Sequence, residues 1–507
     1  MATRRRQGLR RLLWGALAVL VLLAAAVAAN TVRQGSRQID VPAVAPVAVD
    51  AAATAQRLSA AVRFPTVSHD GRPDASAEAF RQLHAWLERA YPQAHAALRR
   101  EQVGGLSLLY TWEGADRSAP PIMLMAHQDV VPVAPGTEGD WQAGPFAGTV
   151  HDGFVWGRGA WDDKGNLVAM MEAVELLARE GFRPRRTVYL AFGHDEETGG
   201  ERGAKAIAAL LASRGVRLEF VLDEGLLITE GVLKGLDAPL ALIGVAEKGY
   251  VNLSLTAHGT PGHASMPPRD TAIGTLARAL ARLEARPMPA QIDGVSAEMF
   301  AAIAPEMQPG PRVLLSNLWL FGPLVRRQLE QGTSTNAMLR STAALTMVAG
   351  GNKVNVLPGQ AQAHVNVRLL PGDTAEAAAA HAHRAIGDAG VAVAQASGPR
   401  AEASPVSPSD SASYRLIART VRELFPGTVV APGLMIAATD SRHMLPIADQ
   451  VYRFSPVRAR SEDLPRFHGT NERISTANLA ELVGFYHRLL VADAAATMPQ
   501  AGPPAAR

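Results

Sequence analysis

The chain has 507 residues, of which 48% are hydrophobic, so it can bury a large core and divide into two or more domains. Its formal net charge is +3, but five of the 50 basic residues precede residue 12, and the other 45 nearly balance the 47 acidic ones. This balance argues against a nucleic-acid partner. Because the sequence contains no cysteine, any metal must be held by histidines and carboxylates.

An apolar segment, Leu12–Ala29, follows the N-terminal arginines. It is long enough for a transmembrane helix, and its basic flank predicts a cytoplasmic N-terminus and a body on the periplasmic, extracellular or lumenal side. Small residues near Ala28 and Ala29 also fit a cleaved signal peptide, which would leave the body secreted. Residues 1–34 are therefore expected to form a basic tip and an anchor or signal, and residues 35–50 a linker.

Short apolar runs alternate with helical stretches between residues 104 and 223. Strands are expected at 106–112, 121–126, 187–192 and 219–222, and helices at 166–180 and 203–215. The alternation is typical of an α/β domain with a central, mostly parallel sheet, whose ligand crevice lies at the carboxyl ends of the strands. His127, Asp195–Glu197 and Asp223 follow three of these strands, so we expect them at one edge of the sheet.

The pattern changes near Lys248 to alternating strands and Ala-rich helices. It predicts a smaller α+β domain over residues 248–404, inserted between the two parts of the first domain, 51–247 and 405–493. The tail, residues 494–507, is expected to be disordered.

Histidines and carboxylates occur in a pattern that suits a hydrolytic site with two divalent cations. Such a site needs a bridging carboxylate, terminal His and carboxylate ligands, and a base near the reacting water. Asp129 lies two residues after His127, on the same side of an extended segment, where it can accept the ring N–H. The neighbouring Glu196 and Glu197 diverge, so one can bind metal while the other carries a proton. Two acids, Asp162–Asp163, precede a predicted helix. One acid would be enough to cap that helix, so the second is available for another role.

Six segments, in order and spacing, resemble the di-zinc metallopeptidase family of carboxypeptidase S, aminoacylase and bacterial glutamate carboxypeptidase. They are "MAHQDVVPV", "GRGAWDDKGN", "GHDEETGG", "VLDEG", "HGTPGHASMPP" and "FHGTNERIS". The resemblance is greatest to the carboxypeptidase S branch, which includes enzymes that make and cleave N-acyl amino acids. It implies a zinc-peptidase-like catalytic domain, with the inserted domain acting as a lid or joining two chains in a homodimer.

The resemblance implies ligands for two zinc ions. Asp162 would bridge them, with His127 and Asp223 completing one ion and Glu197 and His468 the other. Asp223 is preferred to the neighbouring Glu224 because it directly follows the predicted strand.

Further roles follow from the same resemblance. Glu196 would be the general base and Asp129 would orient His127, and the Asp162–Asp163 peptide would be cis. In the inserted domain, His263 would polarise the scissile carbonyl and Arg368 would bind the substrate carboxylate, assisted by Asn355. Asp440 and Arg442 would either line the site or form a structural ion pair.

These inferences predict a metal-dependent hydrolase that cleaves the amide bond to an amino acid with a free carboxylate, as a carboxypeptidase does. An N-acyl amino acid hydrolase or aminoacylase would use the same metal ligands, so the substrate is expected to be a peptide or an N-acyl amino acid. The alternative of another class is a membrane-tethered binding protein without catalysis.

Overall fold

Two compact units make up the computed structural model, which describes residues 2–398 and 400–495. The larger unit comprises Ile39–Val232, Ala238–Lys248 and the chain from Ser404 onward. The smaller unit comprises the N-terminal segment to Gln38, Leu233–Asp237 and Gly249–Ala403. The sequence did not predict that the N-terminal segment and residues 233–237 would belong to the smaller unit.

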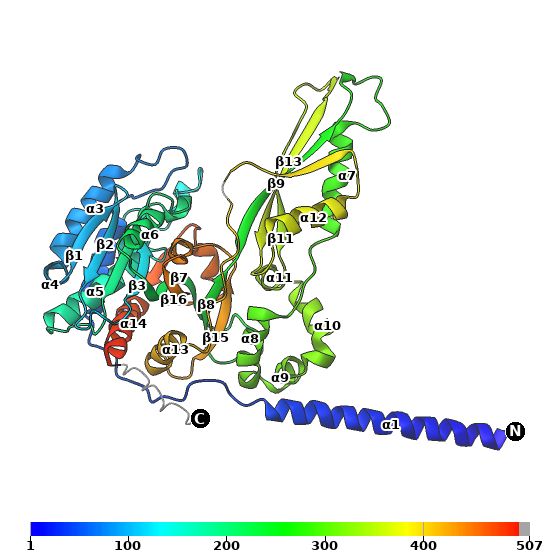
Figure 1. The fold of residues 1–507 in the computed structure, drawn as a ribbon, viewed down its shortest axis with the longest axis horizontal. Coiled ribbons are helices and arrows are strands. Elements are labelled where there is room, and N and C mark those ends of the chain that lie inside the picture. The colour runs from blue at the N-terminus through cyan, green and yellow to red at the C-terminus, as the bar shows by residue number, and fades with distance from the viewer. Residues whose placement is uncertain (1, 399, 496–507) are drawn as a thin grey trace, which may run out of the picture. The chain divides into compact units, whose positions relative to one another are not determined.

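An eight-stranded sheet forms the centre of the larger unit, in the order β1-β2-β6-β3-β7-β16-β8-β15 (Figure 1). Its strands are β1 (Arg99–Val103), β2 (Ser107–Trp112), β3 (Ile122–His127), β6 (Val188–Gly193), β7 (Leu218–Thr229), β8 (Leu240–Glu247), β15 (Val429–Met435) and β16 (Ala448–Ala459).

The sheet is mixed rather than mostly parallel, which corrects the sequence prediction. Strands β6, β3, β7 and β16 run parallel in turn, and β8 pairs with β15 in the same way. The pairs β1–β2, β2–β6 and β16–β8 are antiparallel. The connection of three residues between β1 and β2 is too short for the crossover that a parallel pair requires.

Helices cover the sheet and explain why its central strands are apolar without alternation. All six residues of β3 and all six of β6 are buried, as expected where both faces of a sheet are covered. Helix α6 packs on one face through Ile207 and Leu211, and α5 is buried along most of its length. The helices of this unit are α2 (Ala51–Val62), α3 (Ala77–Ala90), α4 (Pro92–Ala97), α5 (Lys164–Arg179), α6 (Ala204–Ser213), α13 (Ala412–Leu424) and α14 (Thr476–Ala495).

A small sheet consists of β4 (Thr149–His151), β5 (Phe154–Trp156) and β17 (Arg473–Ser475). The loop after β5 contains Asp162, and the loop before β17 contains His468.

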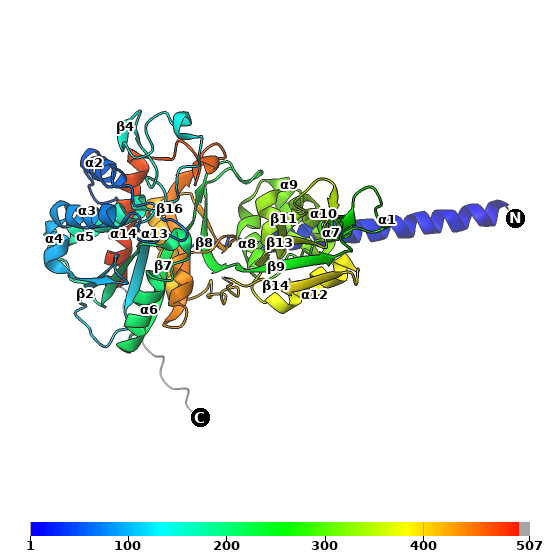
Figure 2. The same ribbon diagram turned by 90° about the horizontal axis from the view of Figure 1, so that it is seen from above.

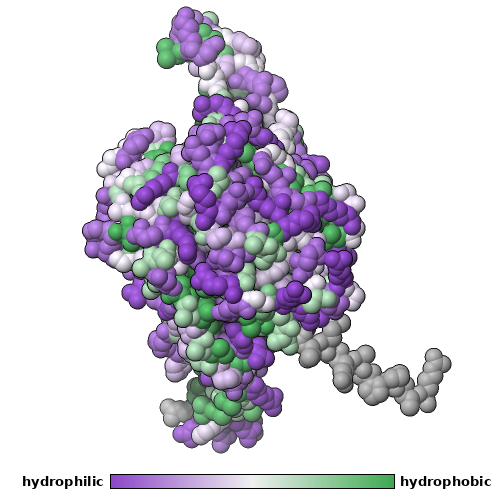
Figure 3. Space-filling model, turned by 90° about the vertical axis from the view of Figure 1, so that its left-hand side faces the viewer, coloured by the Kyte–Doolittle hydropathy of each residue, from purple (hydrophilic) through white to green (hydrophobic). Residues whose placement is uncertain are grey.

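Hydrophilic side chains cover most of the molecular face seen in Figure 3. Residues 494 and 495, which were assigned to the predicted tail, end α14, and residues 496–507 lie outside the described residues.

The smaller unit contains a four-stranded antiparallel sheet in the order β11-β13-β9-β14 (Figure 2). Burial alternates along β9, because α7 and α12 cover one face only. The strands are β9 (Gly249–His258), β11 (Thr342–Gly350), β13 (Gln360–Leu369) and β14 (Val391–Gln395), with a short pair, β10 (Gly262–His263) and β12 (Val356–Leu357). The helices are α7 (Ala272–Ala285), α8 (Gly294–Ile303), α9 (Pro309–Ser316), α10 (Leu318–Leu329), α11 (Thr333–Leu339) and α12 (Ala375–Ile386).

Helix α1 (Ala2–Arg33) contains the apolar segment of the N-terminus. Its part from Gln7 to Arg33 is long and apolar enough to cross a membrane, and none of its most apolar window is buried in the protein. No other helix among the described residues meets the same criteria of length and hydropathy.

Candidate metal centre

The predicted ligands of the larger unit gather where parallel strands of the eight-stranded sheet end. His127 is the last residue of β3 and lies opposite Gly193, the last residue of β6. The acidic residues Asp195–Glu197 follow β6 directly. Asp162 precedes α5, and His468 lies in the loop before β17. Segments more than 300 residues apart in sequence therefore meet at one place.

Asp162 lies at the centre of the group, between the two histidines. Its Oδ1 is 2.9 Å from His127 Nε2, and its Oδ2 is 2.7 Å from His468 Nε2. A further carboxylate stands beside each histidine: Glu224 Oε1 is 3.6 Å from His127 Nε2, and Glu197 Oε2 is 3.5 Å from His468 Nε2. The group therefore has two halves that share one carboxylate, which is the arrangement of a bridging ligand.

Glu224 lies beside this cluster in the structure, whereas the sequence prediction preferred its neighbour Asp223. The ligand atoms of His127, Asp162 and Glu224 all lie within 4.8 Å of one another. The carboxylate of Asp223 is instead occupied by backbone donors, accepting hydrogen bonds from Ser441 N at 2.8 Å and Glu224 N at 3.0 Å. Strand β7 continues past both residues, and successive side chains point to opposite faces of a strand.

Asp129 and Asp163 both contact His127, and Asp129 also binds the acidic loop. The ring Nδ1 is 2.9 Å from the backbone carbonyl of Asp129, closer than the 3.4 Å that separates it from the carboxylate of the same residue. The Asp129 carboxylate accepts hydrogen bonds from the backbone N–H groups of Glu196 and Glu197, at 3.2 and 3.1 Å. Asp163 accepts from His127 N at 3.1 Å, and the Asp162–Asp163 peptide is cis. Asp129 thus positions both the histidine and the acidic loop.

The remaining residues of "GHDEETGG" shape the acidic loop. Asp195, for which the sequence offered no role, closes the turn by accepting a hydrogen bond from Arg202 N at 2.8 Å. Gly193 and Gly200 leave room for the buried Asp440, because a methyl group on either glycine would collide with its carboxylate. Arg442 donates to the Gly199 carbonyl at 3.3 Å, and neither carboxylate oxygen of Asp440 has a hydrogen-bond partner among the described residues.

Burial and mutual repulsion disfavour the ionised form of two acids of the cluster, Glu196 and Glu224. Burial raises the pKa of Glu196 well above its ordinary value; His127 opposes this shift, and Asp440 and Glu197 reinforce it. Burial likewise raises the pKa of Glu224 well above its ordinary value, with Asp162 adding to the effect. Such a concentration of acids is costly unless cations balance it.

The donor set fits divalent metal ions. Imidazole nitrogens and carboxylate oxygens are the ligands that zinc takes where thiolates are absent. Glu197 Oε1 is buried and accepts no hydrogen bond from the described residues, so it retains a free lone pair toward the cluster. Burial lowers the pKa of His468, but its hydrogen bonds to Asp162 and Glu197 outweigh this and raise the pKa to about 10. A metal ion would take the place of the proton in these contacts.

A buried ion pair that the sequence did not reveal joins two of the ligand loops. Glu472 Oε1 accepts hydrogen bonds from the backbone N–H groups of Gly159, Trp161 and Asp162, at 2.9 to 3.0 Å. Its other oxygen binds Arg158 Nη1 at 2.6 Å, and Arg158 Nη2 donates to the His468 carbonyl at 3.0 Å. We call this pair the Arg158–Glu472 clamp. It ties the loop that carries Asp162 to the loop that carries His468.

Three predicted site residues belong to the smaller unit. His263 is exposed on β10, and its Nδ1 lies 2.7 Å from Ser265 Oγ. Asn355 precedes β12, and its carbonyl accepts a hydrogen bond from Ala264 N at 3.0 Å, so Asn355 lies next to the β10 end. Arg368, on β13, donates from Nε to Asn366 Oδ1 at 3.1 Å, and its guanidinium carbon is 5.5 Å from the centre of the Tyr250 ring.

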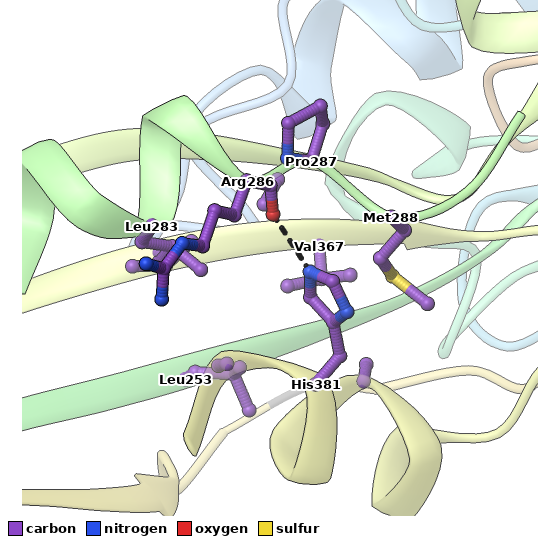
Figure 4. Close-up of a pocket in the computed structure, with 11 residues that line it drawn as sticks. Leu253, Leu283, Arg286, Pro287, Met288, Val367 and His381 are labelled. Atoms are coloured by element: carbon purple, nitrogen blue, oxygen red, sulfur yellow. Dashed lines mark hydrogen bonds between the residues drawn. The ribbon is translucent and has the colours of Figure 1, made fainter. Parts of the chain in front are cut away.

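A crevice in the smaller unit does not resemble a second site. It lies between α7, α12 and the sheet and is lined mainly by apolar side chains, with a free volume of only 20 Å³ (Figure 4). The His381 ring extends into it and hydrogen-bonds to the Arg286 carbonyl at 2.8 Å. This volume is about that of one water molecule by the same measure, so the crevice is a packing gap.

The sequence and the fold both match known proteins. Residues 123–492 match the model of peptidase family M20/M25/M40. The N-fatty-acyl-amino acid synthase/hydrolase PM20D1 of Xenopus tropicalis is 40% identical, over 86% of this chain and 85% of its own length. Probable carboxypeptidase S-like 2 of Dictyostelium discoideum is 38% identical, over 95% of this chain and 93% of its own length.

A solved structure supports the fold. The M20 family metallo-carboxypeptidase Sso-CP2 from Sulfolobus solfataricus superposes with a TM-score of 0.62 at 17% identity, covering 87% of this chain and 99% of that one. The resemblance inferred from six sequence segments is thereby confirmed. Since the family match and both relatives extend over most of its length, the chain belongs to peptidase family M20/M25/M40 and is a metallopeptidase.

Proposed function

We propose that the protein uses two zinc ions to hydrolyse the amide bond between an acyl group and an amino acid with a free carboxylate. The observation that carries the proposal is the position of Asp162, whose two oxygens contact two different histidines. The names of the relatives, one a carboxypeptidase S-like protein and one an N-fatty-acyl-amino acid synthase/hydrolase, support this substrate class.

In this proposal the two ions share Asp162. His127 and Glu224 complete the ligands of one ion, and Glu197 and His468 complete those of the other. When bound, the ions would supply an acidified water and stabilise negative charge on the substrate oxygen.

Glu196 is the proposed general base. Its backbone is fixed by Asp129, and it has no place in either proposed ligand set, so its carboxylate remains available for proton transfer. It would accept a proton from the attacking water and deliver it to the leaving nitrogen, which completes the addition of water across the C–N bond.

Arg368, His263 and Asn355 are the proposed substrate contacts. An arginine can bind a carboxylate through two parallel hydrogen bonds, and the stacking on Tyr250 fixes the direction of the Arg368 side chain. His263 would polarise the scissile carbonyl, and Asn355, beside it on the β10–β12 pair, would assist.

Peptides and N-acyl amino acids share this reacting group and differ in the acyl part. The first relative favours a fatty acyl group, and the second favours a peptide. We give the peptide carboxypeptidase activity first place and retain N-acyl amino acid hydrolysis as the second candidate.

We also propose that α1 anchors the protein in a membrane, with the larger unit and the rest of the smaller unit on the exported side. Val27 and Thr31, on either side of the candidate cleavage residues Ala28 and Ala29, both contact Asn317 of the smaller unit. These contacts support an uncleaved anchor over a signal peptide. The exposed edge strand β11, with Met347 and Val348 in solvent, supports pairing of two chains in a homodimer.

Turnover of matched substrates tests the chemistry. The full chain, loaded with zinc, is assayed with a series of dipeptides and N-fatty-acyl amino acids and with the same compounds as terminal carboxamides. We expect hydrolysis of the free acids, loss of activity in chelator and recovery on addition of zinc. Arg368→Met should raise KM for the acids and leave the slow turnover of the amides unchanged. Equal turnover of acids and amides, or activity that survives metal removal, would contradict the proposal.

A further inference from the structure

The end of helix α1 is joined to the corner between α9 and α10 by a polar network. Asn30 Nδ2 and Gln34 Nε2 both donate to the Ser316 carbonyl, at 2.5 and 3.0 Å. Asn317 Nδ2 donates in return to Thr31 Oγ1 at 2.8 Å. Ser316 and Asn317 are buried, so the end of α1 and this corner form one packed joint (Figure 1).

Helix α10 exposes large apolar side chains beside this joint. Trp319 is 60% exposed and Leu324 is 59% exposed. The indole Nε1 of Trp319 donates to Asn317 Oδ1 at 3.1 Å, which holds the ring next to the joint. Two exposed arginines, Arg326 and Arg327, follow in the last turn of the helix.

We propose that α10 lies in the boundary region of the lipid bilayer, next to the exported end of α1. The proposal rests on the membrane anchoring proposed above. The joint begins at Asn30, directly after the apolar segment ends at Ala29, so it lies at the level where the chain leaves the hydrocarbon region. Trp319 of α10 is thus joined through Asn317 to Thr31, near the end of α1.

The side chains of α10 have the chemistry that this boundary favours. Tryptophan is enriched at the membrane interface, where its ring contacts acyl chains and its N–H is hydrogen-bonded. Leu324 would enter the acyl region, while Arg326 and Arg327 would extend to lipid phosphates. The contact would hold the smaller unit against the membrane, in addition to the single covalent link through α1.

Site-directed labelling tests this position, and the absence of cysteine from the chain makes every introduced thiol unique. Leu324→Cys, Leu20→Cys and Val354→Cys are each labelled with bimane in the full-length protein. The labelled proteins are placed in vesicles of phosphatidylcholine and phosphatidylglycerol, with or without lipids that carry nitroxide quenchers both near the headgroup and along the acyl chain. Val354 is fully exposed in the same unit and serves as the control.

We expect the quenchers to remove most of the fluorescence at positions 20 and 324 and little at position 354. Quenching at position 20 without quenching at position 324 would overturn the position of α10 while leaving the anchor intact. A second chain that covers α10 would give this result. No quenching at either position would overturn both proposals. Equal quenching at 324 and 354 would also overturn the specific role of α10. Zinc-dependent thermal unfolding of each variant confirms that it is folded.

Discussion

At the scale of single residues, the acidic run after β6 divides its tasks between neighbours. Asp195 closes the turn, Glu197 faces His468, and Glu196 is the proposed base rather than a proposed ligand, although its carboxylate also lies close to His127 and to the carboxylate of Glu197. The raised pKa of Glu196 shows how strongly its surroundings disfavour the charge in the absence of metal. Bound cations would favour the ionised form and bring the pKa down toward the range that a base needs at neutral pH.

Substitution of Glu196 separates proton transfer from metal binding. Because Glu196→Gln keeps the size of the side chain and removes only its ability to accept a proton, we expect kcat to fall about 10²- to 10⁴-fold. Zinc content, measured by atomic absorption, should not change. The control is Glu201→Gln, an exposed acid that pairs with Lys205 close to the same loop and should have normal kcat. Normal turnover in Glu196→Gln at full zinc content would disprove the assignment.

At the scale of elements, the sequence was informative where chemistry follows a buried strand. The apolar runs that end at His127 and before Asp195 predicted β3 and β6, and parallel neighbours necessarily bring such ends together. The sequence alone could not decide between Asp223 and Glu224, because the length of β7 and the hydrogen bond from Ser441 N to Asp223 depend on the tertiary structure. The antiparallel pairs β2–β6 and β16–β8, which contribute to the mixed sheet, also have no local sequence signal.

The Arg158–Glu472 clamp could not be predicted from the sequence for a similar reason. Its partners are 314 residues apart, and each resembles an ordinary charged residue in a loop. Only the folded chain shows that both are buried and that Glu472 accepts three backbone hydrogen bonds around Asp162. Only the folded chain therefore reveals the residues that tie together the loops of the proposed ligands.

Variants of the clamp test its role in positioning the loops. Glu472→Gln leaves Arg158 buried without a negative partner and weakens the acceptor of three N–H groups. We expect the free energy of unfolding to fall by about 3 to 5 kcal/mol and zinc affinity to fall about 10- to 100-fold. The double variant Arg158→Met, Glu472→Gln removes the unpaired charge, so stability should partly recover while zinc affinity remains low.

Isothermal titration with zinc and urea unfolding measure the two effects. Asp449→Asn, which breaks the exposed pair with Arg217 in the same unit, is the control and should change neither quantity appreciably. If zinc affinity recovers together with stability in the double variant, the clamp is only structural and does not position the ligands.

At the scale of the whole molecule, metal binding and folding are expected to be coupled. The larger unit buries several acids at the end of its central sheet, and His127 and His468 contact one of them, Asp162. Removal of metal leaves this charge imbalance in the interior, where it destabilises the fold. The acidic loop after β6 and the His468 loop should be the first parts to loosen.

The effect of metal removal should depend on pH. The folded-state pKa values of Glu196, Glu224 and His468 are raised, so their contribution to stability is present below the unfolded pKa and is lost as pH rises through the folded pKa. Zinc competes with protons for the same atoms and binds more tightly as pH rises. The difference in Tm between zinc-loaded and metal-free protein should therefore widen from pH 7 to pH 8.5.

Calorimetry of the full chain in detergent, with zinc or with chelator, measures this difference. Lys164, whose pKa burial lowers to about 7, titrates in both forms, so the comparison of the two forms removes most of its effect. Asp162 has a lowered pKa and contributes in the opposite direction, but only below its ordinary value near 3.8, outside this window.

Metal-free Glu196→Gln lacks one of the buried acids and should have a higher Tm than the metal-free parent at pH 8.5. A Tm difference that stays constant or narrows with pH would show that the buried acids are not balanced by the metal ions.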